Sequence, residues 1–293
     1  MNNVPGRYIE SCPVGCLSAL RATDIVLPEG ALLRCSGCGQ LVSQVSAAHY
    51  WASMARFDRE TFNQPAGRAL RRRHQVAGRR LSRIAALLGR QPEAIRLLDV
   101  GCSRGHFIQS AARRGFRAEG VEPAPQIAAA ARAHGLTVHT GLLEDQRFPD
   151  GSFAAVTLFE VIEHLKEPAT LLRECRRVLE PGGLLVLSTG NAASWTALAM
   201  KERWDYFHIA TDAGHVSFYT PESLSLLAQR CDYAVERIET ARVRFHEKNA
   251  TARPVYVIGK LAAELLNYPA RLAGAGHDML AYLRSQAAPR HSR

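Results

Sequence analysis

The spacing of apolar residues changes once along the chain, near residue 95. Between residues 51 and 94 apolar positions recur every three or four residues among many arginines, which predicts amphipathic helix with a basic outer face. From residue 96 onward short apolar runs alternate with helical stretches, which predicts a mainly parallel sheet covered by helices on both faces. The predicted strands span residues 96–100, 117–121, 137–140, 154–159, 184–189, 233–241 and 279–284, and the predicted helices span 106–114, 125–134, 168–179 and 221–230, with an amphipathic stretch at 253–272.

The first 50 residues differ from the rest because they are rich in turn residues and carry two close pairs of cysteines. We therefore predict four segments. They are a cysteine-rich module at 1–50, a basic helical connector at 51–94, the α/β domain at 95–286 and a tail at 287–293.

The composition is that of an ordinary globular protein, with 47% hydrophobic and 22% charged residues. No stretch approaches the roughly 18 apolar residues of a membrane span, and the N-terminus lacks a secretory-signal pattern, so we expect a cytoplasmic protein. The formal charge of +10 would suit a polyanionic partner. An arginine-rich composition alone can produce that charge, so it is a weak indication of function.

A glycine-containing turn follows the first strand of the α/β region, in the run LLDVGCSRGHF at residues 97–107. Gly101 and Gly105 allow a sharp turn and a close approach to a ligand, which in open α/β sheets binds beyond the carboxyl ends of the strands. The run lacks the G-x-G-x-x-G pattern of dinucleotide-binding loops, because Ser103 and His106 interrupt it. Glu122, at the end of the second strand, can accept hydrogen bonds from ribose hydroxyls, although a surface carboxylate is the alternative role.

Three more motifs follow in order: FPDGSF at 148–153, FEVIEHL at 159–165 and EPGGLL at 180–185. With the turn at 97–107, they resemble the class I S-adenosylmethionine (SAM)-dependent methyltransferases, and the resemblance covers residues 97–190. It implies a Rossmann-like α/β fold with a seven-stranded sheet of order 3-2-1-4-5-7-6, in which the seventh strand is antiparallel.

The resemblance also implies a SAM site. The implied residues are Asp99, Gly101, Ser103 and Gly105 around the methionine portion, Glu122 at the ribose, Leu142 and Leu143 beside the adenine, and Phe159 and Glu160 at the floor.

The sequence departs from the family pattern at three positions. Ser103 replaces the middle glycine of the turn, Ala154 replaces an aspartate at the start of the fourth strand, and Gly190 stands where a proline is common. None of these changes excludes cofactor binding, but they weaken any closer assignment within the family.

The N-terminal segment carries Cys12 and Cys16 as one close pair and Cys35 and Cys38 as a second. In a chain without an export signal, such pairs favour a metal over disulfides, and four thiolates suit a tetrahedral structural zinc. Unligated cysteines and an iron–sulfur cluster are the alternatives. A cysteine module ahead of the α/β domain resembles a group of bacterial methyltransferases with an N-terminal zinc-binding module, many of which act on sugars, cell-surface polysaccharides or natural products.

The segment at 195–219 is rich in aromatic residues, histidines and hydroxyls, as a small-molecule site requires, so we expect it to line the acceptor. Oxygen nucleophiles usually need a general base, and imidazole titrates near neutral pH. His215 is the first candidate, His164 the second and His208 the third; each could instead cap a turn or bond to backbone. The expected reaction is methyl transfer to a small-molecule acceptor (a sugar, lipid-linked or natural-product intermediate), most simply at oxygen.

Two other functions fit parts of the sequence. An RNA methyltransferase would use the basic face at 68–83 on phosphates and show salt-sensitive binding to RNA, although a solvated helix surface is the commoner role of such a face. The base-amino methylation motif Asn/Asp-Pro-Pro-Tyr/Phe is missing, which argues against it. A non-catalytic scaffold of the same fold is disfavoured by the intact Asp99, Gly101, Gly105 and Glu122, and calorimetry without SAM binding would support it.

Overall fold

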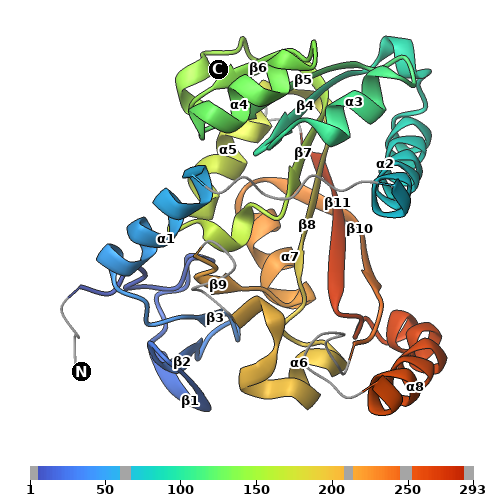
Figure 1. Cartoon of the computed structure of the whole chain (residues 1–293). Coiled ribbons are helices and arrows are strands. Elements are labelled where there is room, and N and C mark those ends of the chain that lie inside the picture. The colour runs from blue at the N-terminus through green and yellow to red at the C-terminus, as the bar shows by residue number, and fades with distance from the viewer. Residues whose placement is uncertain (1–5, 60–66, 208–213, 245–252, 287–293) are drawn as a thin grey trace.

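A twisted seven-stranded sheet forms the centre of the computed structural model, which describes residues 6–59, 67–207, 214–244 and 253–286 (Figure 1). Among these residues its strand order is β6-β5-β4-β7-β8-β11-β10. The strands from β4 to β8 pair in parallel, and β11 is antiparallel to both β8 and β10. Numbered within the sheet this is the order 3-2-1-4-5-7-6, as predicted. The strands are β4 (Arg96–Val100), β5 (Arg117–Glu122), β6 (Val138–Thr140), β7 (Phe153–Phe159), β8 (Leu179–Gly190), β10 (Tyr233–Ala241) and β11 (Asp278–Ser285).

Helices cover both faces of this sheet because successive side chains of a strand point to opposite faces. Leu97 packs with the apolar faces of α2 (Gly67–Leu88) and α3 (His106–Ala112), whereas Leu98 packs with α5 (Pro168–Val178) and α7 (Pro221–Arg230). The same alternation places Leu184 on the first face and Leu185 on the second. The remaining helices are α1 (Ala47–Arg59), α4 (Pro125–Ala133), α6 (Trp195–Met200) and α8 (Arg253–Leu272), with short 3-10 turns η1 (Pro92–Ala94), η2 (Glu144–Gln146), η3 (Ile162–His164), η4 (Lys201–Arg203) and η5 (Asp205–Phe207).

A second, four-stranded sheet lies beside the main one, at the lower left of Figure 1. It contains β1 (Leu20–Leu27), β2 (Gly30–Cys35), β3 (Leu41–Val42) and β9 (Ser217–Phe218), in that order. The sequence analysis predicted no individual strands here, because much of β1 is exposed and lacks a clear alternation of buried positions. The strand β9 comes from the segment at 195–219, so the N-terminal segment and the expected acceptor wall share one sheet.

No helix in the described part of the chain is long and apolar enough to cross a membrane.

Candidate functional site

The turn after β4 has the backbone geometry that its glycines permit. Gly101 has φ 72° and Gly105 has φ 75°, in the left-handed region that side chains disfavour. A Cβ at Gly101 would also lie 2.6 Å from Cγ2 of Val161. Ser103, at the position where the family has glycine, adopts φ 48°, so the departure from the pattern preserves the turn.

Glu122 ties this turn to the one that follows β5. One carboxylate oxygen accepts a hydrogen bond from the backbone N–H of Ser103 at 2.8 Å, and the other accepts one from Ala124 at 2.9 Å. The carboxylate therefore fixes the relative position of the two turns at the carboxyl edge of the sheet.

Asp99 is buried beneath the same turn and accepts a hydrogen bond from the Thr157 hydroxyl at 2.5 Å. Burial raises the pKa of Asp99 to about 7, and the hydrogen bond from Thr157 opposes the increase. The two leucines proposed to flank an adenine differ: Leu142 is 57% exposed, whereas Leu143 is 1% exposed and belongs to the core.

Phe159 and Glu160, at the end of β7, both contact residues that the sequence did not connect with them. The guanidinium of Arg80 lies 4.2 Å from the centroid of the Phe159 ring. Glu160 accepts hydrogen bonds from the hydroxyls of Ser188, at 2.7 Å, and Tyr206, at 2.5 Å. Glu160 thus joins the ends of β7 and β8 to the segment at 195–219.

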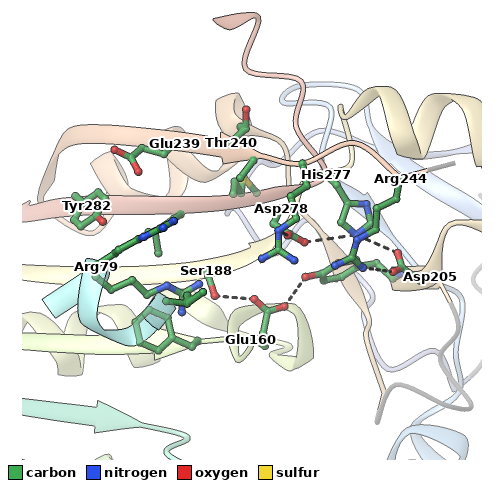
Figure 2. Close-up of a pocket in the computed structure, with 18 of the residues that line it drawn as sticks. Arg79, Glu160, Ser188, Asp205, Glu239, Thr240, Arg244, His277, Asp278 and Tyr282 are labelled. Carbon is green, nitrogen blue, oxygen red and sulfur yellow. Dashed lines mark hydrogen bonds and ion pairs between the residues drawn. The ribbon is translucent and has the colours of Figure 1, made fainter. Parts of the chain in front are cut away.

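Part of this set lines a cavity of about 950 Å³, shown in Figure 2. Gly101 and Ser103 of the turn, Phe159 and Glu160 at the end of β7, and His164 and His215 all line it. Other predicted cofactor residues are not among its lining residues: Asp99, Gly105, Glu122, Leu142 and Leu143. Its other walls come from α2, from β10 and β11 and from the residues that flank them. The turn, the floor and the two described candidate bases therefore face one space.

The histidine wall has a defined arrangement. Nδ1 of His215 lies 3.1 Å from the backbone oxygen of Tyr206, and the two rings stack with centroids 5.2 Å apart. Nε2 of His215 lies 3.9 Å from a carboxylate oxygen of Glu163, and the His164 ring centroid is 4.7 Å from that of His215. Burial lowers the pKa of His215 to about 4, while burial and the charge of Glu160 raise the pKa of Glu163 well above its usual range. The third candidate, His208, lies outside the described residues.

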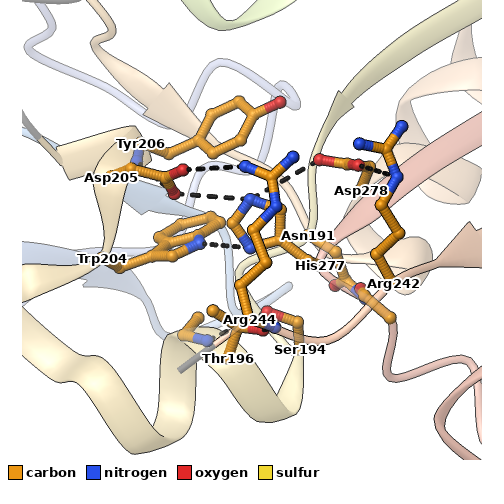
Figure 3. A network of polar contacts seen from close by, with 12 residues as sticks. Asn191, Ser194, Thr196, Trp204, Asp205, Tyr206, Arg242, Arg244, His277 and Asp278 are labelled. Atoms are coloured by element: carbon orange, nitrogen blue, oxygen red, sulfur yellow. Dashed lines mark hydrogen bonds and ion pairs between the residues drawn. The ribbon is translucent and has the colours of Figure 1, made fainter. Parts of the chain in front are cut away.

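The segment at 195–219 contributes fewer aromatic side chains to the cavity than its composition suggested. Trp204 is completely buried and its indole N–H donates to Nδ1 of His277 at 3.2 Å (Figure 3). Tyr206 does line the cavity, and its ring packs directly against Gly190. A Cβ atom added to Gly190 would lie only 2.6 Å from Cδ1 of Tyr206. Glycine at position 190 is therefore needed for the Tyr206 ring to reach Glu160.

Sequence reasoning missed half of the arginines and carboxylates that line the cavity. Three arginines of the basic helix face the cavity, and others come from the chain after β10 and from the end of α8. The helical period located the buried face of α2, but not the neighbour beyond its polar face. The missed charged residues are Arg242, Arg244, Arg271, Glu239 and Asp278, whereas Asp205 lies in the segment that was expected to line the acceptor.

The four N-terminal cysteines lie together. Their Sγ atoms are all within 4.8 Å of one another, with Cys12 and Cys38 separated by 3.5 Å, and none forms a disulfide. A tetrahedral zinc with bonds of about 2.3 Å separates its sulfur ligands by about 3.8 Å. Backbone hydrogen bonds from Gly15 to Cys12 and from Gly39 to Cys35 close the two turns. The set fits a zinc ion.

The sheet order, the antiparallel β11 and the glycine turn facing Glu122 define a Rossmann-like α/β protein of the class I methyltransferase type. The sequence model of one protein family, described as a methyltransferase domain, matches residues 69–238, which is more than half of the chain. The chain belongs to this family.

Curated relatives match a shorter part of the chain. A ubiquinone biosynthesis O-methyltransferase of Xanthomonas axonopodis pv. citri is 37% identical over 127 residues, which is 40% of this chain and 52% of that protein. The chain thus spans about half the length of that curated relative.

Solved structures share the fold at low identity. A SAM-dependent methyltransferase from Archaeoglobus fulgidus aligns with a TM-score of 0.52 at 19% identity, over 72% of this chain and 94% of that one. The geranyl diphosphate C-methyltransferase of Streptomyces coelicolor A3(2) aligns with a TM-score of 0.54 at 19% identity, over 80% and 98%.

Proposed function

We propose that this protein transfers the methyl group of SAM to a hydroxyl oxygen of a small-molecule acceptor. The observation that carries the proposal is the shared cavity: the glycine turn and two histidines line the same space. Its volume, about 950 Å³, is at the upper end of the range for small-molecule sites. The O-methyltransferase named among the curated relatives supports oxygen as the methylated atom.

The residues present fit SAM. The glycine turn would leave room for the methionine portion, the carboxylate of Glu122 would accept hydrogen bonds from the ribose hydroxyls, and exposed Leu142 would cover the adenine. Leu143 would support Leu142 from the core rather than touch the cofactor. SAM supplies an activated methyl group on its sulfonium.

His215 is the proposed general base. Because a carbonyl oxygen only accepts hydrogen bonds, the contact with Tyr206 places the proton of the neutral ring on Nδ1 and leaves a lone pair on Nε2. With its pKa lowered to about 4, the ring is neutral at physiological pH. Nε2 would accept the proton of the acceptor hydroxyl, and bound SAM would supply the methyl group to that oxygen. His164 remains the second candidate, and His208 a prediction.

Calorimetry with S-adenosylhomocysteine tests the cofactor site. Wild-type protein should bind it, and Gly101→Val should not, because the added side chain would collide with Val161. Gly135→Val is the matched control, since Gly135 has a similar φ of 75° but no neighbour within 4 Å. The proposal is wrong if the wild-type protein does not bind the nucleoside.

Transfer from methyl-labelled SAM into a cell extract tests the acceptor class and the base. The label should enter the small-molecule fraction, and label in RNA would contradict the proposal. His215→Ala should lower the rate by about a hundredfold or more while retaining S-adenosylhomocysteine affinity. His134→Ala, at an exposed helix end, is the control and should keep full activity.

We also propose that Cys12, Cys16, Cys35 and Cys38 hold a structural zinc ion in a module at 1–50, followed by the connector at 51–94, the α/β domain at 95–286 and the tail at 287–293. The convergence of the four sulfur atoms supports the metal. Metal analysis of the purified protein should find zinc, and Cys35→Ser should lose it. Protein that folds stably without any bound metal would contradict the assignment.

A further inference from the structure

The cavity contains more positive than negative side chains. Six arginines line it, against four carboxylates. The arginines form two groups: one comes from α2, and the other comes from the chain after β10 and the end of α8. The first group is Arg79, Arg80 and Arg83, and the second is Arg242, Arg244 and Arg271.

The two groups lie beside different parts of the site. Arg80 lies against Phe159, whose ring also contacts Phe107 directly after the glycine turn. If SAM binds at this turn, as proposed, Arg80 would lie on the side of its methionine portion. In the second group Arg242 pairs with Asp278 and Arg244 pairs with Asp205, and Arg271 lines the same cavity (Figure 2). The second group is therefore available to another ligand.

The carboxylates near the second group leave its positive charge incompletely paired. Arg242 lies 3.6 Å from Asp278 and Arg244 lies 3.4 Å from Asp205, each through a single contact (Figure 3). The same two acids also face Nε2 of buried His277, at 3.5 and 3.4 Å. In the described part of the chain, no carboxylate lies within ion-pair distance of Arg271. Arg242 and Arg244 thus depend on two acids that His277 also engages, and Arg271 pairs with neither acid.

SAM adds to this positive charge. Its sulfonium and ammonium groups outweigh its one carboxylate, so the loaded cavity carries one further net positive charge. In a partly enclosed site with a lower effective dielectric than water, like charges repel and an anionic ligand is favoured. A neutral acceptor would leave the excess charge uncompensated.

Resting on the proposed function, we infer that the acceptor carries an oxyanion group, a phosphate or a carboxylate, that binds to Arg242, Arg244 and Arg271 while its hydroxyl faces His215. Guanidinium groups present paired N–H donors that match both kinds of oxyanion. The anion anchors the acceptor at one end of the cavity, and the glycine turn holds SAM at another. The arginine group thereby selects charged over neutral acceptors.

Calorimetric titration of small anions into SAM-saturated protein tests this inference. Inorganic phosphate and pyrophosphate are the probes for a phosphate group on the acceptor, and benzoate and malonate are the probes for a carboxylate. Arg244→Gln and Arg271→Gln should each weaken binding by about tenfold or more, because each removes a charge-assisted hydrogen bond. Arg113→Gln, an exposed arginine at the end of α3, removes the same charge elsewhere and should have no effect.

The charge of the cofactor provides a second readout. The anion should bind at least about twofold more tightly with SAM than with S-adenosylhomocysteine, which lacks the sulfonium charge. Binding of the phosphates alone would indicate a phosphorylated acceptor, and binding of the carboxylates alone a carboxylic acid. Binding of neither, or equal binding to all variants, would overturn the inference. Failure to bind S-adenosylhomocysteine would instead refute the proposed function, and the same anions are then titrated into the free protein to test the arginine site by itself.

Discussion

Replacing Asp99 by asparagine probes the electrostatics under the cofactor turn. Asp99 is 3% exposed at the end of β4, and its carboxylate accepts a hydrogen bond from the Thr157 hydroxyl. Burial raises its pKa to about 7; the hydrogen bond from Thr157 and the charge of Arg80 offset only part of that effect. The folded chain therefore holds the Asp99 proton at pH values where the unfolded chain has lost it.

This difference makes the fold less stable as the pH rises. Between 3.8, the ordinary pKa of the group, and about 7, the unfolded chain binds fewer protons than the folded chain, so the free energy of unfolding falls with pH. Over this whole pH range the free energy of unfolding falls by about 4 kcal/mol. The part that falls between about pH 5 and pH 8 is about 2.5 kcal/mol. The Asp99→Asn variant has no group to titrate here and lacks this contribution.

Urea unfolding of both proteins at about pH 5 and pH 8 measures the effect. The free energy of unfolding of the wild-type protein, relative to Asp99→Asn, should be about 2.5 kcal/mol greater at the lower pH. Asp145→Asn, at an exposed position in η2, controls for the loss of a carboxylate as such. A difference that stays constant with pH, or grows toward high pH, would refute the assignment of a raised pKa to Asp99.

Three further predictions concern the cavity and the cysteine module. If His215 is the base, kcat/KM should stay constant between about pH 8 and pH 6, because the pKa of His215 is about 4. A base with the ordinary histidine pKa of about 6.5 would lose roughly three quarters of the activity over the same range, so a midpoint near pH 6.5 would contradict the assignment. Gly190→Ala should displace the Tyr206 ring, cost about 1–3 kcal/mol in urea unfolding and lower turnover more than S-adenosylhomocysteine affinity; unchanged turnover would show that the ring position is unimportant. Removal of zinc by a chelator should lower the melting temperature by about 5 °C or more, and an unchanged melting curve would contradict a structural metal. Turnover should also fall, because β3 of the N-terminal segment pairs with β9, which lies just after His215.

Much of the fold was predictable because local sequence and global packing agree there. The strand at Arg96–Val100, the strand at Tyr233–Ala241 and the helix at Pro221–Arg230 have the predicted bounds. The helix begins where Thr220 caps it and proline occupies the first turn, which are signals that act within a few residues. The strands β1 and β3 were not predicted, since β3 has only two residues and depends on pairing with β9, far along the chain.

Single aromatic residues could not be assigned between core and cavity by composition. Trp204 and Tyr206 are separated by one residue, yet the first is completely buried against His277 and the second lines the cavity. Both roles suit a large side chain with one polar atom. The deciding contact is made by His277, a residue far along the chain, and no local pattern reports it.

The basic helix illustrates the limit of periodicity most clearly. Its buried positions include Ala77, Leu81 and Ile84, which follow the helical period. The sequence analysis left two roles open for the opposite face, contact with phosphates and solvated surface, and favoured the second. In the structure that face is divided, because Arg79, Arg80 and Arg83 line the cavity while the arginines at 68, 71, 72 and 73 are exposed. Helical period fixes which residues point away from the core, but only tertiary structure brings β10 and β11 opposite one part of that face. The basic face of this one helix is thereby split between the cavity and the exposed surface, and the sequence pattern alone could not locate the division.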